Sequence, residues 1–206
     1  MKYFCVEGGH FLSIREVVED LDKIIEYVEK DFFQNRVAQL PQAESLDKKV
    51  REKITGSLLS LNSREKEAVE LAEVYKGLEV IRDSLKRVAN AVETKIAEKT
   101  LFSNKAAEEM RSLFSELHLL FRNLSDFLLT NNEILFNWLK EKQESFEGAC
   151  RRYATEHEER LVKGICMPRS STLYLAILEN FCNVSWHLFN LAQSCKNVFP
   201  ASESFK

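Results

Sequence analysis

Four carboxylates occur in two closely spaced pairs, and together they could bind a metal ion. Glu44 and Asp47 are three residues apart, and Glu79 and Asp83 are four residues apart. At either spacing, two side chains project from the same side of a helix. Antiparallel neighbouring helices would bring the two pairs to levels within one to two helical turns of each other. We therefore predict an oxygen-rich site for magnesium, manganese, iron or zinc.

The alternative is that these acids are ordinary charges on the surface of helices. Basic residues lie close to each acid in the sequence: Lys48, Arg51, Arg82 and Lys86. Spacing alone favours this alternative, because oppositely charged neighbours are common in charged helices and contribute little to stability.

The sequence gives little support to an enzyme. It contains no nucleophile elbow, P-loop, dinucleotide fingerprint or His-Glu-x-x-His motif. A carboxylate-bridged metal enzyme in a helical bundle would need Glu-x-x-His motifs on two helices. Neither His157 nor His187 is preceded by glutamate at the third position before it. The five cysteines form no Cys-x-x-Cys pair, which favours free thiols in a reducing, cytosolic compartment.

Charge argues against a nucleic-acid partner, and hydropathy argues against a transmembrane segment. The chain carries 29 basic and 32 acidic residues, so its formal charge is −3, whereas proteins that bind nucleic acids usually carry a basic excess. No apolar run reaches the roughly 18–20 residues that would span a bilayer, and the first residues do not resemble a signal peptide. We expect no nucleic-acid partner and no transmembrane segment in this sequence.

Apolar residues recur at helical spacing through nearly the whole chain, which predicts an all-α fold. Capping boxes are expected at Asn62–Glu65 and Thr130–Glu133. The six predicted helices cover about 13–33, 41–61, 65–99, 103–128, 130–161 and 168–195. The order of their lengths suggests two tandem antiparallel three-helix bundles, one over 12–99 and the other over 103–197. Residues 1–11 would form an N-terminal extension, and 198–206 a frayed tail.

Two motifs of the first bundle resemble those of the PhoU family. The segment Leu78–Asp83 is similar to the PhoU signature Glu-Arg-Ile-Gly-Asp-His and keeps its two acids and its isoleucine. The segment Glu44–Asp47 resembles the second PhoU motif, Glu-Lys-x-x-Asp, and keeps both acids.

The second bundle carries the more specific resemblance. The segments Arg151–Leu161 and Gly164–Pro168 are similar to a connection in the PhoU-like tails of bacterial sodium/phosphate cotransporters related to type II. Ser103 and Glu108 also fit that tail. Cys182 and Trp186 stand where the family's second signature has acids, so the resemblance restricts metal binding to Glu44, Asp47, Glu79 and Asp83.

The resemblance implies a non-enzymatic domain that restrains phosphate uptake at the cytoplasmic face of the membrane. Its partner would be a transporter domain or another protein of the transport system, and a homodimer is an alternative assembly. We favour a cytoplasmic part of the cotransporter. The alternatives are a free-standing PhoU-like regulator, a metal-dependent helical-bundle enzyme, and a plain interaction bundle without metal.

Overall fold

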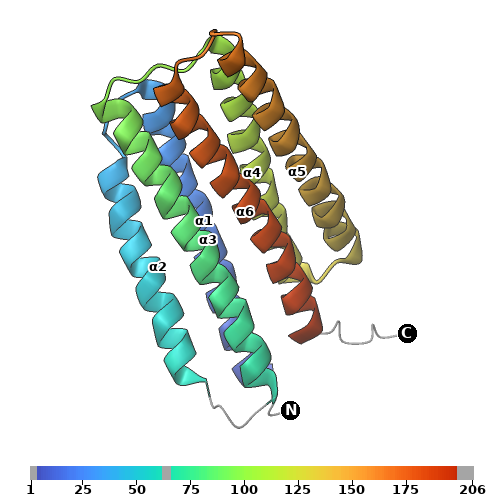
Figure 1. Ribbon diagram of the computed structural model, residues 1–206. Helices are drawn as coiled ribbons and strands as arrows, with labels where there is room; N and C mark the ends of the chain where they lie inside the picture. Colours follow the sequence, from blue (N-terminus) through green and yellow to red (C-terminus); the bar gives the residue numbers. More distant parts are fainter. Residues whose placement is uncertain (1–3, 62–65, 199–206) are drawn as a thin grey trace.

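The computed structural model describes residues 4–61 and 66–198, and all its regular elements over these residues are α-helices (Figure 1). The helices are α1 (Phe4–Gln34), α2 (Leu40–Ser60), α3 (Lys66–Ala97), α4 (Asn104–Thr130), α5 (Glu133–Val162) and α6 (Pro168–Val198). Successive helices run in opposite directions (Figure 1). The all-α prediction is therefore confirmed.

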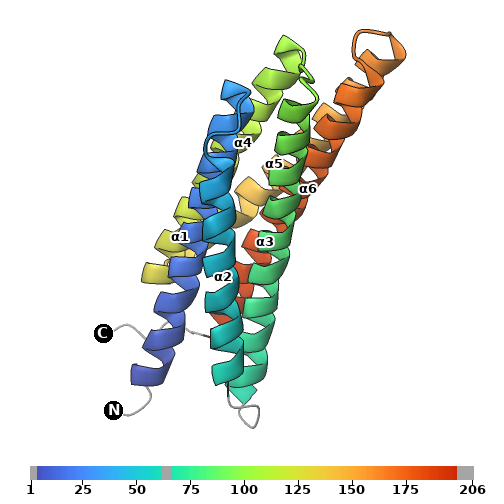
Figure 2. The same cartoon turned by 90° about the vertical axis from the view of Figure 1, so that its left-hand side faces the viewer.

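The helices pack as two groups of three that are joined side by side. Helices α1, α2 and α3 contact one another, and so do α4, α5 and α6. The two groups meet where α3 runs antiparallel to α6 and where α1 lies beside α4 (Figures 1 and 2). A continuous set of buried apolar side chains runs through both groups, so the two triplets share one core.

Some predicted boundaries differ from the structure. Helix α1 begins at Phe4, so most of the expected N-terminal extension continues the first helix. At the start of α5 the N-cap is Asn132, whose side chain accepts a hydrogen bond from the backbone of Ile134, whereas Thr130 still belongs to α4. The capping box predicted at 62–65 and the tail from 199 onward lie outside the described residues.

Polar side chains cap the first turns of two helices. Oδ2 of the fully buried Asp31 accepts hydrogen bonds of 2.8–2.9 Å from the backbone nitrogens of Ala38, Gln39 and Leu40, where α2 begins. The hydroxyl of Ser103 accepts a bond from the backbone of Ala106 and caps α4. Each cap satisfies donors that a helix leaves free in its first turn.

None of the helices that the structure describes is long and apolar enough to cross a membrane.

Candidate functional site

Three of the four predicted metal ligands lie close together, but an arginine occupies the space between them. Arg82 of α3 is only 8% exposed. Its guanidinium donates to both oxygens of Asp47 at 3.0 and 3.1 Å, to Glu79 at 2.9 Å and to Asp83 at 2.8 Å. Asp47 comes from α2, so the ion pair joins two helices of the first triplet. Arg82 thus supplies the positive charge that these acids need.

The fourth predicted ligand, Glu44, is exposed and has no contact with this arginine cluster among the interactions of the described residues. With Asp47 it lines a separate hollow of about 120 Å³ between α2 and α3. Across the described ranges, no group of three or more histidines, cysteines or acids is arranged to hold a metal ion. The guanidinium of Arg82 occupies the space among the three acids and bonds to each of them, so a cation at this position would have to displace it.

We expect that replacing Glu79 and Asp83 together by alanine leaves the metal content of the purified protein unchanged. Arg82 holds these acids by hydrogen bonds and fills the space among them, so we expect no bound metal to be lost with them. Elemental analysis of the parent and the double variant measures this directly. A clear drop in the double variant would support the metal site predicted from the sequence.

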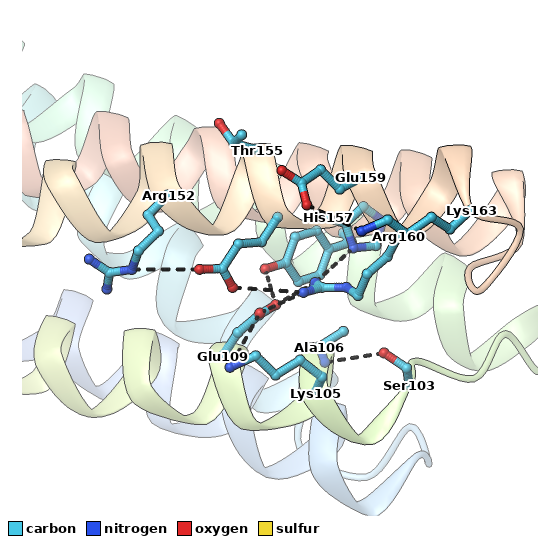
Figure 3. A network of polar contacts seen from close by, with 12 residues as sticks. Ser103, Lys105, Ala106, Glu109, Arg152, Thr155, His157, Glu159, Arg160 and Lys163 are labelled. Atoms are coloured by element: carbon cyan, nitrogen blue, oxygen red, sulfur yellow. Dashed lines mark hydrogen bonds and ion pairs between the residues drawn. The ribbon is translucent and has the colours of Figure 1, made fainter.

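The second triplet contains a more deeply buried polar network, drawn in Figure 3. Glu109 of α4 is 2% exposed. Both of its oxygens accept hydrogen bonds from Arg160 of α5 (Figure 3), at 2.9 and 2.8 Å. The hydroxyl of Tyr174 of α6 also donates to it, at 2.6 Å. A single carboxylate therefore ties together all three helices of this triplet. Burial and the bond to Glu109 raise the pKa of Tyr174, which keeps the phenol protonated.

His157 extends this network beneath the turn between α5 and α6. Its ring stacks on Tyr174 with centroids 4.2 Å apart, and its Nδ1 lies 3.3 Å from an Arg160 nitrogen. Because arginine can only donate, Nδ1 must be the acceptor and the ring proton resides on Nε2. Burial, followed by the charge of Arg160, lowers the pKa of His157 and keeps it neutral. Nε2 is buried and has no hydrogen-bond partner within residues 4–61 and 66–198.

A third cluster crosses between the two triplets. His118 of α4 contacts Asp22 of α1 through Nδ1 and Glu29 of α1 through Nε2, the latter at 3.1 Å. Burial opposes protonation of this ring, but the bonds to the two acids outweigh it and raise the pKa of His118 to about 9. The imidazolium therefore donates from both nitrogens at neutral pH. This cluster and the two arginine clusters are electrostatic links between helices.

The sequence interpretation missed the acid that matters most in the second triplet. It named Glu108, which is exposed, whereas the adjacent Glu109 is buried. Glu109 follows Ala106 by three positions and precedes Leu113 by four, so it stands in line with the apolar stripe of α4. A carboxylate in an apolar stripe indicates a buried polar partner. That signal was available in the sequence.

Comparison with known proteins identifies the fold. No family model matches the chain, and no curated protein matches it in sequence. Among solved structures, the chain resembles the crystal structure of PhoU from Pseudomonas aeruginosa, with a TM-score of 0.64 and 16% sequence identity. The match covers 95% of this chain and 98% of that one. The chain thus has the PhoU fold over nearly its full length.

Proposed function

We propose that this chain is a non-enzymatic, PhoU-like regulatory domain of phosphate transport. The observation that carries the proposal is the match to PhoU across 95% of the chain, which includes both triplets and the contact between them. The sequence resemblance at Glu79–Asp83 and at the connection between α5 and α6 supports the same assignment. The clusters described above fit this role, because each of them joins neighbouring helices of the bundle.

The more specific form of the proposal places the domain in the cytoplasm, at the inner face of the membrane, as part of a sodium-dependent phosphate cotransporter. A free-standing regulator of phosphate uptake is the alternative. In both cases the domain acts by docking through its helical faces against a transporter or another protein of the transport system. The signal would then pass through contact between proteins.

Deleting the coding segment for this chain is expected to raise phosphate uptake when external phosphate is plentiful. The reason is that the domain restrains the transporter in the proposed role. Uptake of radiolabelled phosphate into cells measures the effect, and restoring the segment on a plasmid should reverse it. Unchanged uptake in the deletion strain would contradict the proposed role. Dependence of the effect on external sodium would favour the cotransporter, and independence from sodium the free-standing regulator.

Trp186 is the side chain that we expect to contribute most to the docking contact. It lies on α6, is 50% exposed, and lines hollows of about 770 and 280 Å³ on either side of it. Tryptophan is enriched among the residues that contribute most to binding energy at protein interfaces. Replacing it by alanine should weaken transporter binding by about 2 kcal/mol, or roughly thirtyfold in Kd.

The matched control is Leu129→Ala. Leu129 is also exposed and apolar, but it lies near the end of α4, away from these hollows. Binding of both variants to the transporter in detergent, together with their thermal unfolding, separates lost contact from lost stability. Equal affinity of the parent and Trp186→Ala would place the contact on another face.

A further inference from the structure

Two cysteines face each other across the contact between α5 and α6. Cys150 on α5 is 4% exposed, and Cys182 on α6 is partly exposed. Both are free thiols. The two thiols interact with each other, and both line one hollow between these helices. The stack of His157 on Tyr174 fixes the register of the two antiparallel helices. Cys150 lies seven residues before His157 and Cys182 eight residues after Tyr174, so the two cysteines lie at the same level, which is the first geometric requirement for a disulfide.

The pair can be reached from a hollow on the surface. Both cysteines line the hollow of about 770 Å³ between α5 and α6 that also contains Arg151 and Trp186. A small solute can therefore reach the pair through this hollow, and Cys182, the more exposed of the two, is the thiol it would meet. Cys195 is the opposite case, because it is 1% exposed in the core, where burial raises its pKa to about 12.

The surroundings give the two thiols different roles. The hydrogen bond from Cys150 lowers the pKa of Cys182, and the charge of Arg151 acts in the same direction, against burial and the charge of Glu147. The same hydrogen bond and burial raise the pKa of Cys150. Because the thiolate is the reactive form of cysteine, Cys182 is the nucleophile of the pair and Cys150 is its partner.

We propose that Cys150 and Cys182 form a peroxide-reactive dithiol that closes into a disulfide between α5 and α6. The thiolate of Cys182 attacks one oxygen of a hydroperoxide, so that a sulfur–oxygen bond forms, the oxygen–oxygen bond breaks, and an alcohol or water leaves. The thiol of Cys150 then attacks the sulfenic acid. The disulfide forms, the sulfur–oxygen bond breaks, and the departing hydroxide leaves as water with the proton of Cys150.

This step balances, because the two sulfurs together lose two electrons and the hydroperoxide gains them. The resulting bond would fix α5 against α6 in the wall of the hollow, one helical turn from Trp186. Oxidation would thus change the shape and mobility of the surface beside that tryptophan. This modification site does not depend on the proposed function, since the reaction needs only the two thiols and a hydroperoxide.

Peptide mapping of the intact chain tests the proposal. The protein is treated with hydrogen peroxide, its remaining thiols are alkylated, and it is digested without reduction. We expect a linked peptide containing Cys150 and Cys182, lighter by two hydrogens than the two reduced peptides, that disappears on treatment with dithiothreitol. Cys166, which is partly exposed in the turn between α5 and α6, is the reference thiol and should remain alkylated.

Two variants separate the roles. Cys182→Ser should abolish the loss of free thiols, whereas Cys150→Ala should leave a sulfenic acid at Cys182 that dimedone traps. Cys195→Ser is the matched control and should form the linked peptide as the parent does. The proposal is overturned if the parent forms no linked peptide, if the bond involves Cys166 or Cys195 instead, or if Cys182 is oxidised no faster than Cys166.

Discussion

Replacing Arg160 by methionine is expected to lower the free energy of unfolding by about 3–5 kcal/mol, the range found when one partner of a buried ion pair is removed. The variant leaves the carboxylate of Glu109 in the core, where Tyr174 is its one remaining close donor among the described residues and the ammonium of Lys105 is 3.9 Å away. Methionine retains most of the aliphatic volume of arginine, so the loss reports the charge rather than a cavity. Urea unfolding followed by circular dichroism measures it.

A double-mutant cycle tests the same ion pair, and we expect its two single variants to lose different amounts of stability. Glu109→Gln should cost less than Arg160→Met, because Arg160 lies at the edge of the core and can turn toward Glu156, 4.0 Å away, and toward water. The double variant should be more stable than Arg160→Met alone, since it leaves no charge buried without a partner. If the two losses simply add, Glu109 and Arg160 do not act as a pair.

Arg151→Met is the matched control for this experiment. Arg151 is also an arginine of α5 and pairs with Glu147 four residues earlier, but its side chain is 73% exposed. Exposed pairs of this kind contribute only about 0.3–0.5 kcal/mol. A loss comparable to that of Arg160→Met would mean that the substitution harms the helix itself rather than a buried ion pair.

The helices could be predicted from the sequence because burial of one face imposes a period that local residues display. Pro168 marks the start of a helix as expected, since proline at the first position acts locally. Serine at the N-cap also acts locally, and Ser103 caps α4 in the structure. The start of α1 was misplaced because Gly8 and Gly9 weaken a helix without ending one. Propensity alone does not set such a boundary.

The candidate site could be predicted only in part, because the positions of its side chains depend on how the helices pack. Spacing correctly indicated that Asp47 of α2 would meet Glu79 and Asp83 of α3. The sequence also named Arg82 among the basic residues near these acids, but it could not indicate that this arginine would be buried among them, because its burial depends on the packing of α3 against α2. For the same reason, no local pattern linked His118 to Asp22 and Glu29, which are nearly a hundred residues earlier.

His118 makes stability depend on pH in a direction that can be stated in advance. Its pKa is about 9 in the folded protein and 6.5 when unperturbed, so folding favours the protonated ring. The contribution is therefore complete below about pH 6.5 and is lost as the pH rises through 9. A shift of this size corresponds to about 3 kcal/mol, because one pKa unit equals about 1.4 kcal/mol.

We expect the unfolding free energy of the parent to fall by about 3 kcal/mol more than that of His118→Gln between pH 6.5 and pH 9.5. Glutamine still offers one donor to the acids, but it does not titrate. His187→Gln is the matched control: burial lowers the pKa of His187, so its contribution is lost only as the pH falls, and the variant should follow the parent above pH 7. Parallel profiles of the parent and His118→Gln would contradict the assignment. Because His118 links α4 to α1, the lost stability belongs to the contact between the two triplets. The protection of amides in α1 and α4 against hydrogen exchange, corrected for the intrinsic rate at each pH, should therefore fall with pH before the protection of α5 does.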